Sequence, residues 1–155
     1  MANTASLLPL VPRIFFLYLE PATITYGMIQ TYATRLPIFE LSSAAYSGLP
    51  VPSLAAPAMS ISFLFCIMLY GLIILLATPP NKRTLQLHIL VLAIADFTHW
   101  ASLFSTIAQN HPHGWAGVFD TADWTPEVWN LATYPLTTLA IKFATLAGLF
   151  GEIRG

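Results

Sequence analysis

The chain has 155 residues, of which 56% are hydrophobic and only 8% are charged, and its formal net charge is −1. Soluble domains carry about 25% charged residues, so this composition indicates a membrane protein, of a length that suits one domain. The near-neutral charge leaves no basic patch for phosphates and excludes nucleic acid as a partner. A single cysteine excludes a disulfide framework and a thiolate zinc cluster.

The first predicted membrane span covers about residues 12–34, after a short interfacial leader, residues 1–11, and we expect this first apolar segment to be retained. Its polar residues share one helical face, and Glu20 lies in the middle of that face. Pro21 follows Glu20 directly and removes a backbone donor, which predicts a kink beside the acid. We therefore expect a helix with a polar face directed inward.

The second predicted span covers about residues 54–78 and is the most apolar of the chain. Residues 35–53, which precede it, contain three prolines, a glycine and a serine pair, so they are predicted to form a loop. Pro79 and Pro80 end the span.

The third predicted span covers about residues 85–107 and carries a polar stripe on an otherwise apolar helix. At 100° per residue, one side collects His88, Asp96, His99, Ser102 and Thr106. Such a stripe belongs inside a helix bundle or along a water-bearing cavity.

The fourth predicted span covers about residues 126–150, after a polar and aromatic loop, residues 108–125. Asn130, Tyr134 and Thr137 share one of its faces, and Pro135 is expected to bend it. The predicted fold class is therefore all-α: a single domain, residues 1–155, forming an integral membrane four-helix bundle.

Four spans place both termini on one side of the membrane. Arg13, the pair Lys82–Arg83 and Arg154 lie on that side, against Arg35 on the other. The positive-inside rule makes the first side cytosolic, and we expect the endoplasmic reticulum as the location. Arg13 and Lys142 are expected to extend to the lipid headgroups.

Glu20 and Asp96 are the predicted acid/base pair. They lie ~12 and ~16 Å from the cytosolic edge at 1.5 Å per residue, so two carboxyl groups on different helices reach a similar depth. We expect one protonated acid and one carboxylate, the arrangement of acid/base catalysis. His99 follows Asp96 by one turn and is expected to pair with it. The alternative is structural: buried acids can simply hydrogen-bond neighbouring helices.

A metal site is not expected. His111 and His113 lie near Asp120 and Asp123, but the segment offers neither a third imidazole nor a helical frame. Signatures of phosphate loops, serine hydrolases and metalloproteases are absent from the sequence. No cofactor is predicted.

The runs FFLYLEPATITYG (residues 15–27) and ADFTHW (residues 95–100), in a four-span layout, resemble a group of small fungal integral membrane proteins. These are encoded beside polyketide and meroterpenoid synthases, and some open epoxides as hydrolases or cyclases. The layout is more distantly similar to emopamil-binding-protein-like sterol isomerases. The resemblance implies that membrane-embedded acids protonate an epoxide or an alkene.

The expected function is therefore epoxide opening on a lipophilic polyketide or prenylated intermediate, with Glu20, Asp96 and His99 as catalytic residues. An isoprenoid or sterol-like isomerase and a non-catalytic lipid-binding or scaffold subunit stay open as alternatives. The expected partners are the lipophilic substrate and membrane lipids, and self-association into a homo-oligomer also stays open. Substrate contacts are expected from Phe16, Tyr26, Trp100, Asn130 and Tyr134.

Overall fold

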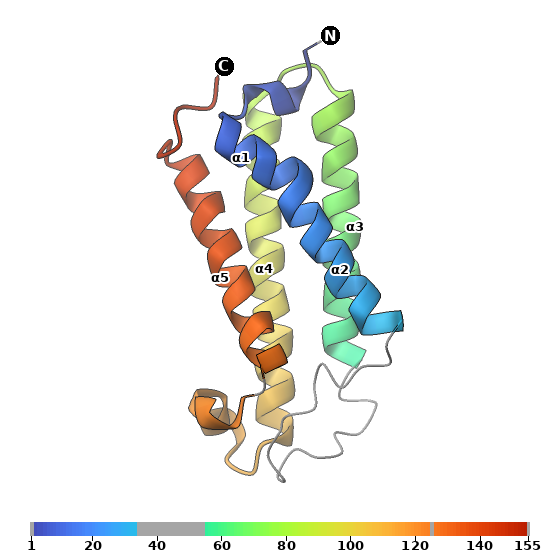
Figure 1. The fold of residues 1–155 in the computed structure, drawn as a ribbon, viewed down its shortest axis with the longest axis vertical. Helices are drawn as coiled ribbons and strands as arrows, with labels where there is room; N and C mark the ends of the chain where they lie inside the picture. Colours follow the sequence, from blue (N-terminus) through green and yellow to red (C-terminus); the bar gives the residue numbers. More distant parts are fainter. Residues whose placement is uncertain (1, 34–54, 125, 155) are drawn as a thin grey trace.

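The computed structural model describes residues 2–33, 55–124 and 126–154, and this part of the chain is helical without strands. The loop predicted for residues 35–53, with Arg35, lies outside the described residues. The described residues form four long helical segments that pack together, the first of them running obliquely across the others (Figure 1). They comprise α1 (Leu10–Ile14), the π-helical segment η2 (Phe15–Leu19) and α2 (Glu20–Ala33) in succession, then α3 (Ala55–Ala77), α4 (Lys82–Asn110) and α5 (Pro126–Leu146).

The first helical segment is interrupted where the sequence predicts a disturbance. Pro21 has no amide hydrogen to donate, and the segment just before it widens into η2, where the amide of Glu20 donates to the carbonyl of Phe15, five residues back. The extra residue in this turn changes the direction in which the following side chains point. The disturbance therefore lies directly beside the acid.

The leader packs more closely than a loose interfacial segment would. Residues Thr4–Leu7 form a 3₁₀ turn (η1), and Leu8 is buried with a 1% exposed fraction. The hydroxyl of Thr4 donates to the carbonyl of Pro79, 2.7 Å away, and α1 begins two residues earlier than predicted. The amide of Arg154 donates to the carbonyl of Leu7, so the two ends of the chain meet.

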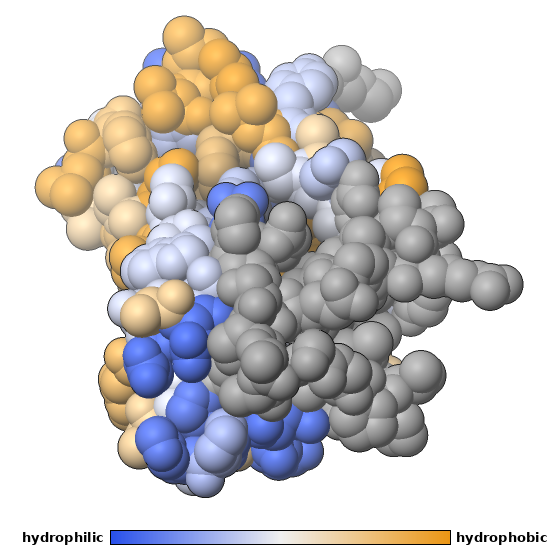
Figure 2. Space-filling model, turned by 60° about the horizontal axis from the view of Figure 1, so that its bottom comes forward, coloured by the Kyte–Doolittle hydropathy of each residue, from blue (hydrophilic) through white to orange (hydrophobic). Residues whose placement is uncertain are grey.

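Polar and apolar residues occupy different parts of the surface. Two helices, Met59–Ala77 and Lys82–Asn110, are long and apolar enough to cross a membrane. Figure 2 looks towards the end that carries the loop between α4 and α5, where hydrophilic residues gather. Many large apolar side chains on the flanks are exposed, among them Phe63 at 61%, Ile94 at 54% and Leu136 at 60%.

Both termini and the turn between α3 and α4 lie at one end of the bundle, and the loop after α4 lies at the other (Figure 1). Lys82 and Asp120 are both exposed, so each can be replaced by a cysteine, in a Cys66→Ser background, and then labelled. In membrane vesicles, a cysteine at position 82 is expected to react from the cytosolic side and one at position 120 from the lumen. Reaction of both from one side would refute the four-span topology.

Candidate functional site

Three charged side chains from three helices meet in the interior. Lys142 Nζ of α5 lies 2.6 Å from Oε1 of Glu20 and 2.5 Å from Oδ2 of Asp96 on α4. The exposed fractions of Glu20, Asp96 and Lys142 are 1%, 3% and 0%. One ammonium group thus lies between two carboxyl groups, although Lys142 is distant in sequence from both acids. We call these three residues the buried triad.

Asp96 has a further partner on α5. The hydroxyl of Thr138 donates to Oδ2 of Asp96 at 2.7 Å, so this oxygen accepts hydrogen bonds from both Thr138 and Lys142. Hydrogen bonds from a hydroxyl and an ammonium to one oxygen stabilise the charged form of a carboxyl group. Oδ1 of the same carboxylate takes part in neither bond.

Two members of the triad, Glu20 and Asp96, line a cavity of about 640 Å³, a size typical of small-molecule sites. Glu20, Asp96, His99 and Thr138 contribute polar groups to its buried part. Ile24, Ile61 and Leu64 contribute apolar surface. The rest of the lining comes from Thr23, Tyr26, Gly27, Asn130, Leu131, Thr133, Tyr134, Pro135 and Thr137.

Three of the five residues expected to contact a substrate line this cavity: Tyr26, Asn130 and Tyr134. The other two lie elsewhere. Phe16 is buried in the hydrophobic core, where its ring makes an edge contact with Phe15. The indole of Trp100 donates to the carbonyl of Ala132 at 2.8 Å and therefore ties α4 to α5.

His99 lines the cavity as expected, but its predicted pairing with Asp96 is wrong. Its Nδ1 lies 3.4 Å from the hydroxyl oxygen of Ser60 on α3, whereas the carboxylate of Asp96 accepts hydrogen bonds from Lys142 and Thr138. Spacing of three residues places His99 and Asp96 on one face, but α5 supplies stronger partners for the carboxylate. His99 is thereby oriented separately from the acids.

The expectation that Lys142 reaches the headgroups is also wrong, whereas that for Arg13 stays a prediction. Lys142 is fully buried in the triad, and Arg13 donates through Nη2 to the carbonyls of Ser6 and Leu8. The sequence does contain a pattern that indicates an inward position for Lys142. Asn130, Tyr134, Thr138 and Lys142 follow one another at intervals of four, which places the lysine on the polar face of its helix.

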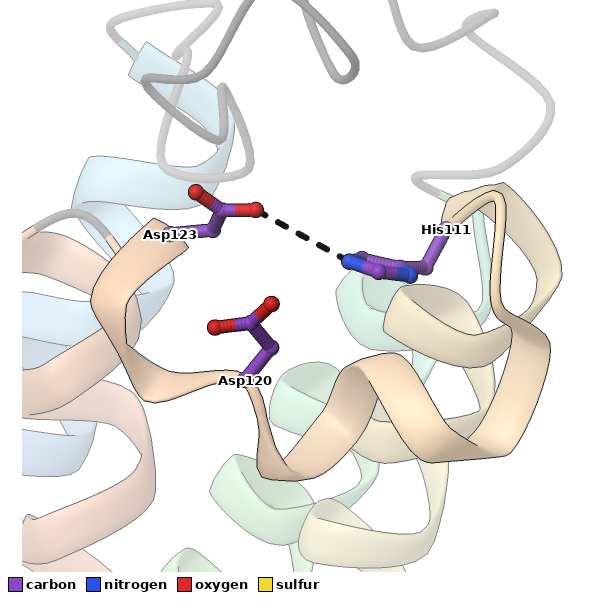
Figure 3. Close-up of side chains that lie close together, drawn as sticks. All are labelled: His111, Asp120 and Asp123. Atoms are coloured by element: carbon purple, nitrogen blue, oxygen red, sulfur yellow. Dashed lines mark ion pairs between the residues drawn. The ribbon is translucent and has the colours of Figure 1, made fainter.

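A second cluster lies in the loop after α4, where ligand atoms of His111, Asp120 and Asp123 lie within 4.8 Å of one another. Figure 3 shows the imidazole of His111 directed at Asp123, with 3.8 Å between Nε2 and Oδ2. Nδ1 of His111 accepts a hydrogen bond from the amide of His113, so in the neutral ring the proton belongs on Nε2. Nε2 then faces the carboxylate as a donor and has no lone pair for a metal. This geometry favours a histidine–aspartate contact over a metal centre.

Chelation is accordingly expected to leave the folded fraction and the activity unchanged. His113→Gln should also be neutral, because its side chain is exposed. His111→Gln should lower stability by about 1–3 kcal/mol through the loss of a buried partner, without loss of turnover per folded molecule. These quantities can be measured by thermal unfolding and product formation with and without EDTA. Inactivation by EDTA that added zinc reverses would contradict the assignment.

The described residues therefore form an all-helical protein that has two helices able to cross a membrane and a charged cluster in its interior. Residues 5–152 match the model of a family described as a domain of unknown function (DUF7704). Because this match covers nearly the whole chain, the protein belongs to that family. No curated protein and no solved structure matches it significantly.

Proposed function

We propose that the protein is a membrane-bound enzyme of fungal secondary metabolism that opens an epoxide on a lipophilic polyketide or prenylated intermediate by acid/base catalysis. The observation that carries the proposal is the pair Glu20 and Asp96, which come from different helices, share Lys142 and line one cavity. A purely structural ion pair would need only one acid for one lysine. The second acid therefore provides a carboxyl group that the ion pair does not need and that can take part in catalysis.

The proposed setting is a four-span bundle in the endoplasmic reticulum membrane, with both termini in the cytosol. The apolar outer side chains and the two helices that are long and apolar enough to cross a membrane support it. The first segment and α5 carry Glu20, Thr138 and Lys142 within their length. All three are buried in the bundle, so they do not face the lipid.

Charge balance assigns roles to the two acids. Burying a net charge is costly, so a cluster with one ammonium group is most stable when only one carboxyl group is ionised. Asp96 accepts two hydrogen bonds at Oδ2, whereas among the described residues Glu20 is held by its ion pair with Lys142. We therefore assign the carboxylate to Asp96 and the proton to Glu20. Lys142 and Thr138, rather than His99, supply the reason for this assignment.

In the proposed reaction, Glu20 gives its proton to the epoxide oxygen as a carbon–oxygen bond breaks. Water or a hydroxyl group of the substrate forms the new bond to that carbon, which gives a diol or a ring. The proton of this nucleophile passes to Asp96, whose Oδ1 is not engaged by Lys142 or Thr138, or to His99. Transfer of a proton back to Glu20 completes the cycle. Polarising the epoxide needs no metal or organic cofactor in this scheme.

The experiment that tests this proposal uses purified protein in phospholipid vesicles and a panel of lipophilic epoxides. Diol or cyclic ether should form with the wild type, and the double variant Glu20→Gln/Asp96→Asn should form none at equal folded amounts. Rearranged alkene in place of an opened epoxide would favour an isoprenoid isomerase. Wild-type protein that converts no member of the panel would favour the scaffold role.

A further inference from the structure

The exposed part of the cavity lining is confined to two helices. The lining residues of α3 (Ile61 and Leu64) and of α4 (Asp96 and His99) are all buried. Every exposed lining residue belongs to α2 or α5: Thr23, Tyr26, Asn130, Thr133, Tyr134 and Thr137. All lining residues of α3 and α4 therefore belong to the buried floor of the cavity, and the cavity opens through the seam between α2 and α5.

This opening lies along the side of the bundle. Thr23 falls near the middle of the first helical segment, Leu10–Ala33, and Tyr134 near the middle of α5. Their hydroxyl groups form a short hydrogen bond that bridges the seam. A side opening at half the length of a membrane-spanning helix faces the hydrocarbon core of the bilayer, which is about 30 Å thick.

The two walls of the opening differ in chemistry. Ile24, Ile61 and Leu64 make the inner α2 and α3 surface apolar, and α2 adds two hydroxyl groups, of Thr23 and Tyr26. By contrast, α5 presents Asn130 and four hydroxyl groups, of Thr133, Tyr134, Thr137 and Thr138. The hydroxyl of Thr133 donates to the carbonyl of Trp129 at 2.7 Å, so its proton is satisfied within its own helix. Its oxygen can still accept a hydrogen bond from a ligand.

We propose that the opening between α2 and α5 admits an amphiphilic ligand directly from the lipid, with its oxygen-bearing edge along α5 and its hydrocarbon against α2 and α3. The inference rests on the proposed function and specifies its substrate class: a chain that dissolves in the bilayer and carries polar groups beside the epoxide. Such a ligand reaches Glu20 and Asp96 without crossing the aqueous ends of the bundle. The Thr23–Tyr134 hydrogen bond must open for it to pass.

The test blocks the opening and measures binding. The test variant carries Thr133→Cys at the rim of the opening, in a Cys66→Ser background. The control variant carries Leu136→Cys in the same background; Leu136 is 60% exposed on the same helix and does not line the cavity. Each variant is treated with a bulky lipid-soluble maleimide in phosphatidylcholine vesicles. The probe is a farnesyl epoxide bearing a diazirine, and photolabelling is compared before and after treatment of the same folded sample.

Treatment at position 133 should reduce photolabelling at least ~10-fold, equivalent to ~1.4 kcal/mol of binding, and treatment at position 136 should change it little. Tyr26→Cys, on the α2 side and 64% exposed in the wild type, should behave like Thr133→Cys. Equal labelling after treatment at all three positions, or no labelling of untreated protein, would overturn the inference.

Photolabelling requires binding but not turnover, so the two proposals can fail separately. Blocked labelling together with a wild type that opens no epoxide would keep the side opening and refute the epoxide chemistry. Product formation that continues after treatment at position 133 would refute the opening and keep the chemistry.

Discussion

Lys142→Met is expected to lower the free energy of unfolding by about 3–5 kcal/mol, the cost of breaking a buried ion pair from one side. The substitution keeps most of the side-chain length and removes the ammonium group between Glu20 and Asp96. Two carboxyl groups would then lie together without a cation, in a site whose exposed fractions do not exceed 3%. Thermal unfolding in detergent, followed by size-exclusion chromatography, measures the loss.

A triple variant separates the electrostatic cause from a packing defect. Lys142→Met combined with Glu20→Gln and Asp96→Asn carries no charge in the triad, so most of the lost stability should return. Lys82→Met, on an exposed lysine at the start of α4, is the matched control and should change stability little. A triple variant as unstable as Lys142→Met would show that the lysine acts through its packing.

Glu20→Gln and Asp96→Asn, made singly, should each reduce turnover at least ~100-fold, the lower range for lost acid/base catalysis. Each amide keeps the shape of the acid and some of its hydrogen bonds, so both variants should fold. Product formed in microsomes, divided by the amount of folded protein, gives the comparison. Near-normal turnover in both variants would support the scaffold role.

Thr138→Val distinguishes the two acids in the same assay. It removes one of the two hydrogen bonds to Asp96 and leaves Glu20 untouched, so its effect on turnover should lie between those of the wild type and Asp96→Asn. Glu152→Gln, which changes an exposed acid in the tail, serves as the control and should be neutral. Activity lost only in proportion to folded protein would make the acids structural.

The helices could be predicted from the sequence because hydrophobic runs and proline breaks are local signals. Helices were expected over residues 54–78 and 85–107 and are observed over Ala55–Ala77 and Lys82–Asn110. The extra turn at the start of α4 is favoured by Asn81, whose side chain accepts from the amide of Thr84 and caps the helix. Pro80 ends the preceding apolar run but does not prevent a helix from starting two residues later.

The site was predictable only in part, because periodicity gives the face of a helix but not its neighbour. The polar stripes correctly brought Glu20 and Asp96 to one place. They could not show that Lys142 lies between them, since a lysine near a helix end has two destinations, the headgroups or a buried acid. Trp100 follows His99 by a rotation of about 100°, which carries its ring out of the cavity lining.

The order of the triad along the chain has a consequence for biosynthesis. In the proposed membrane bundle, Glu20 and Asp96 are synthesised first, and the cation that they share arrives only with α5. Until then, the nascent protein holds two acids in the bilayer without a counter-ion. Insertion of each acid costs a few kcal/mol. Docking of the last helix is thus the step that completes charge balance. Ribosomal products that stop before position 142 would be expected to stay open and to be removed by the quality control of the membrane.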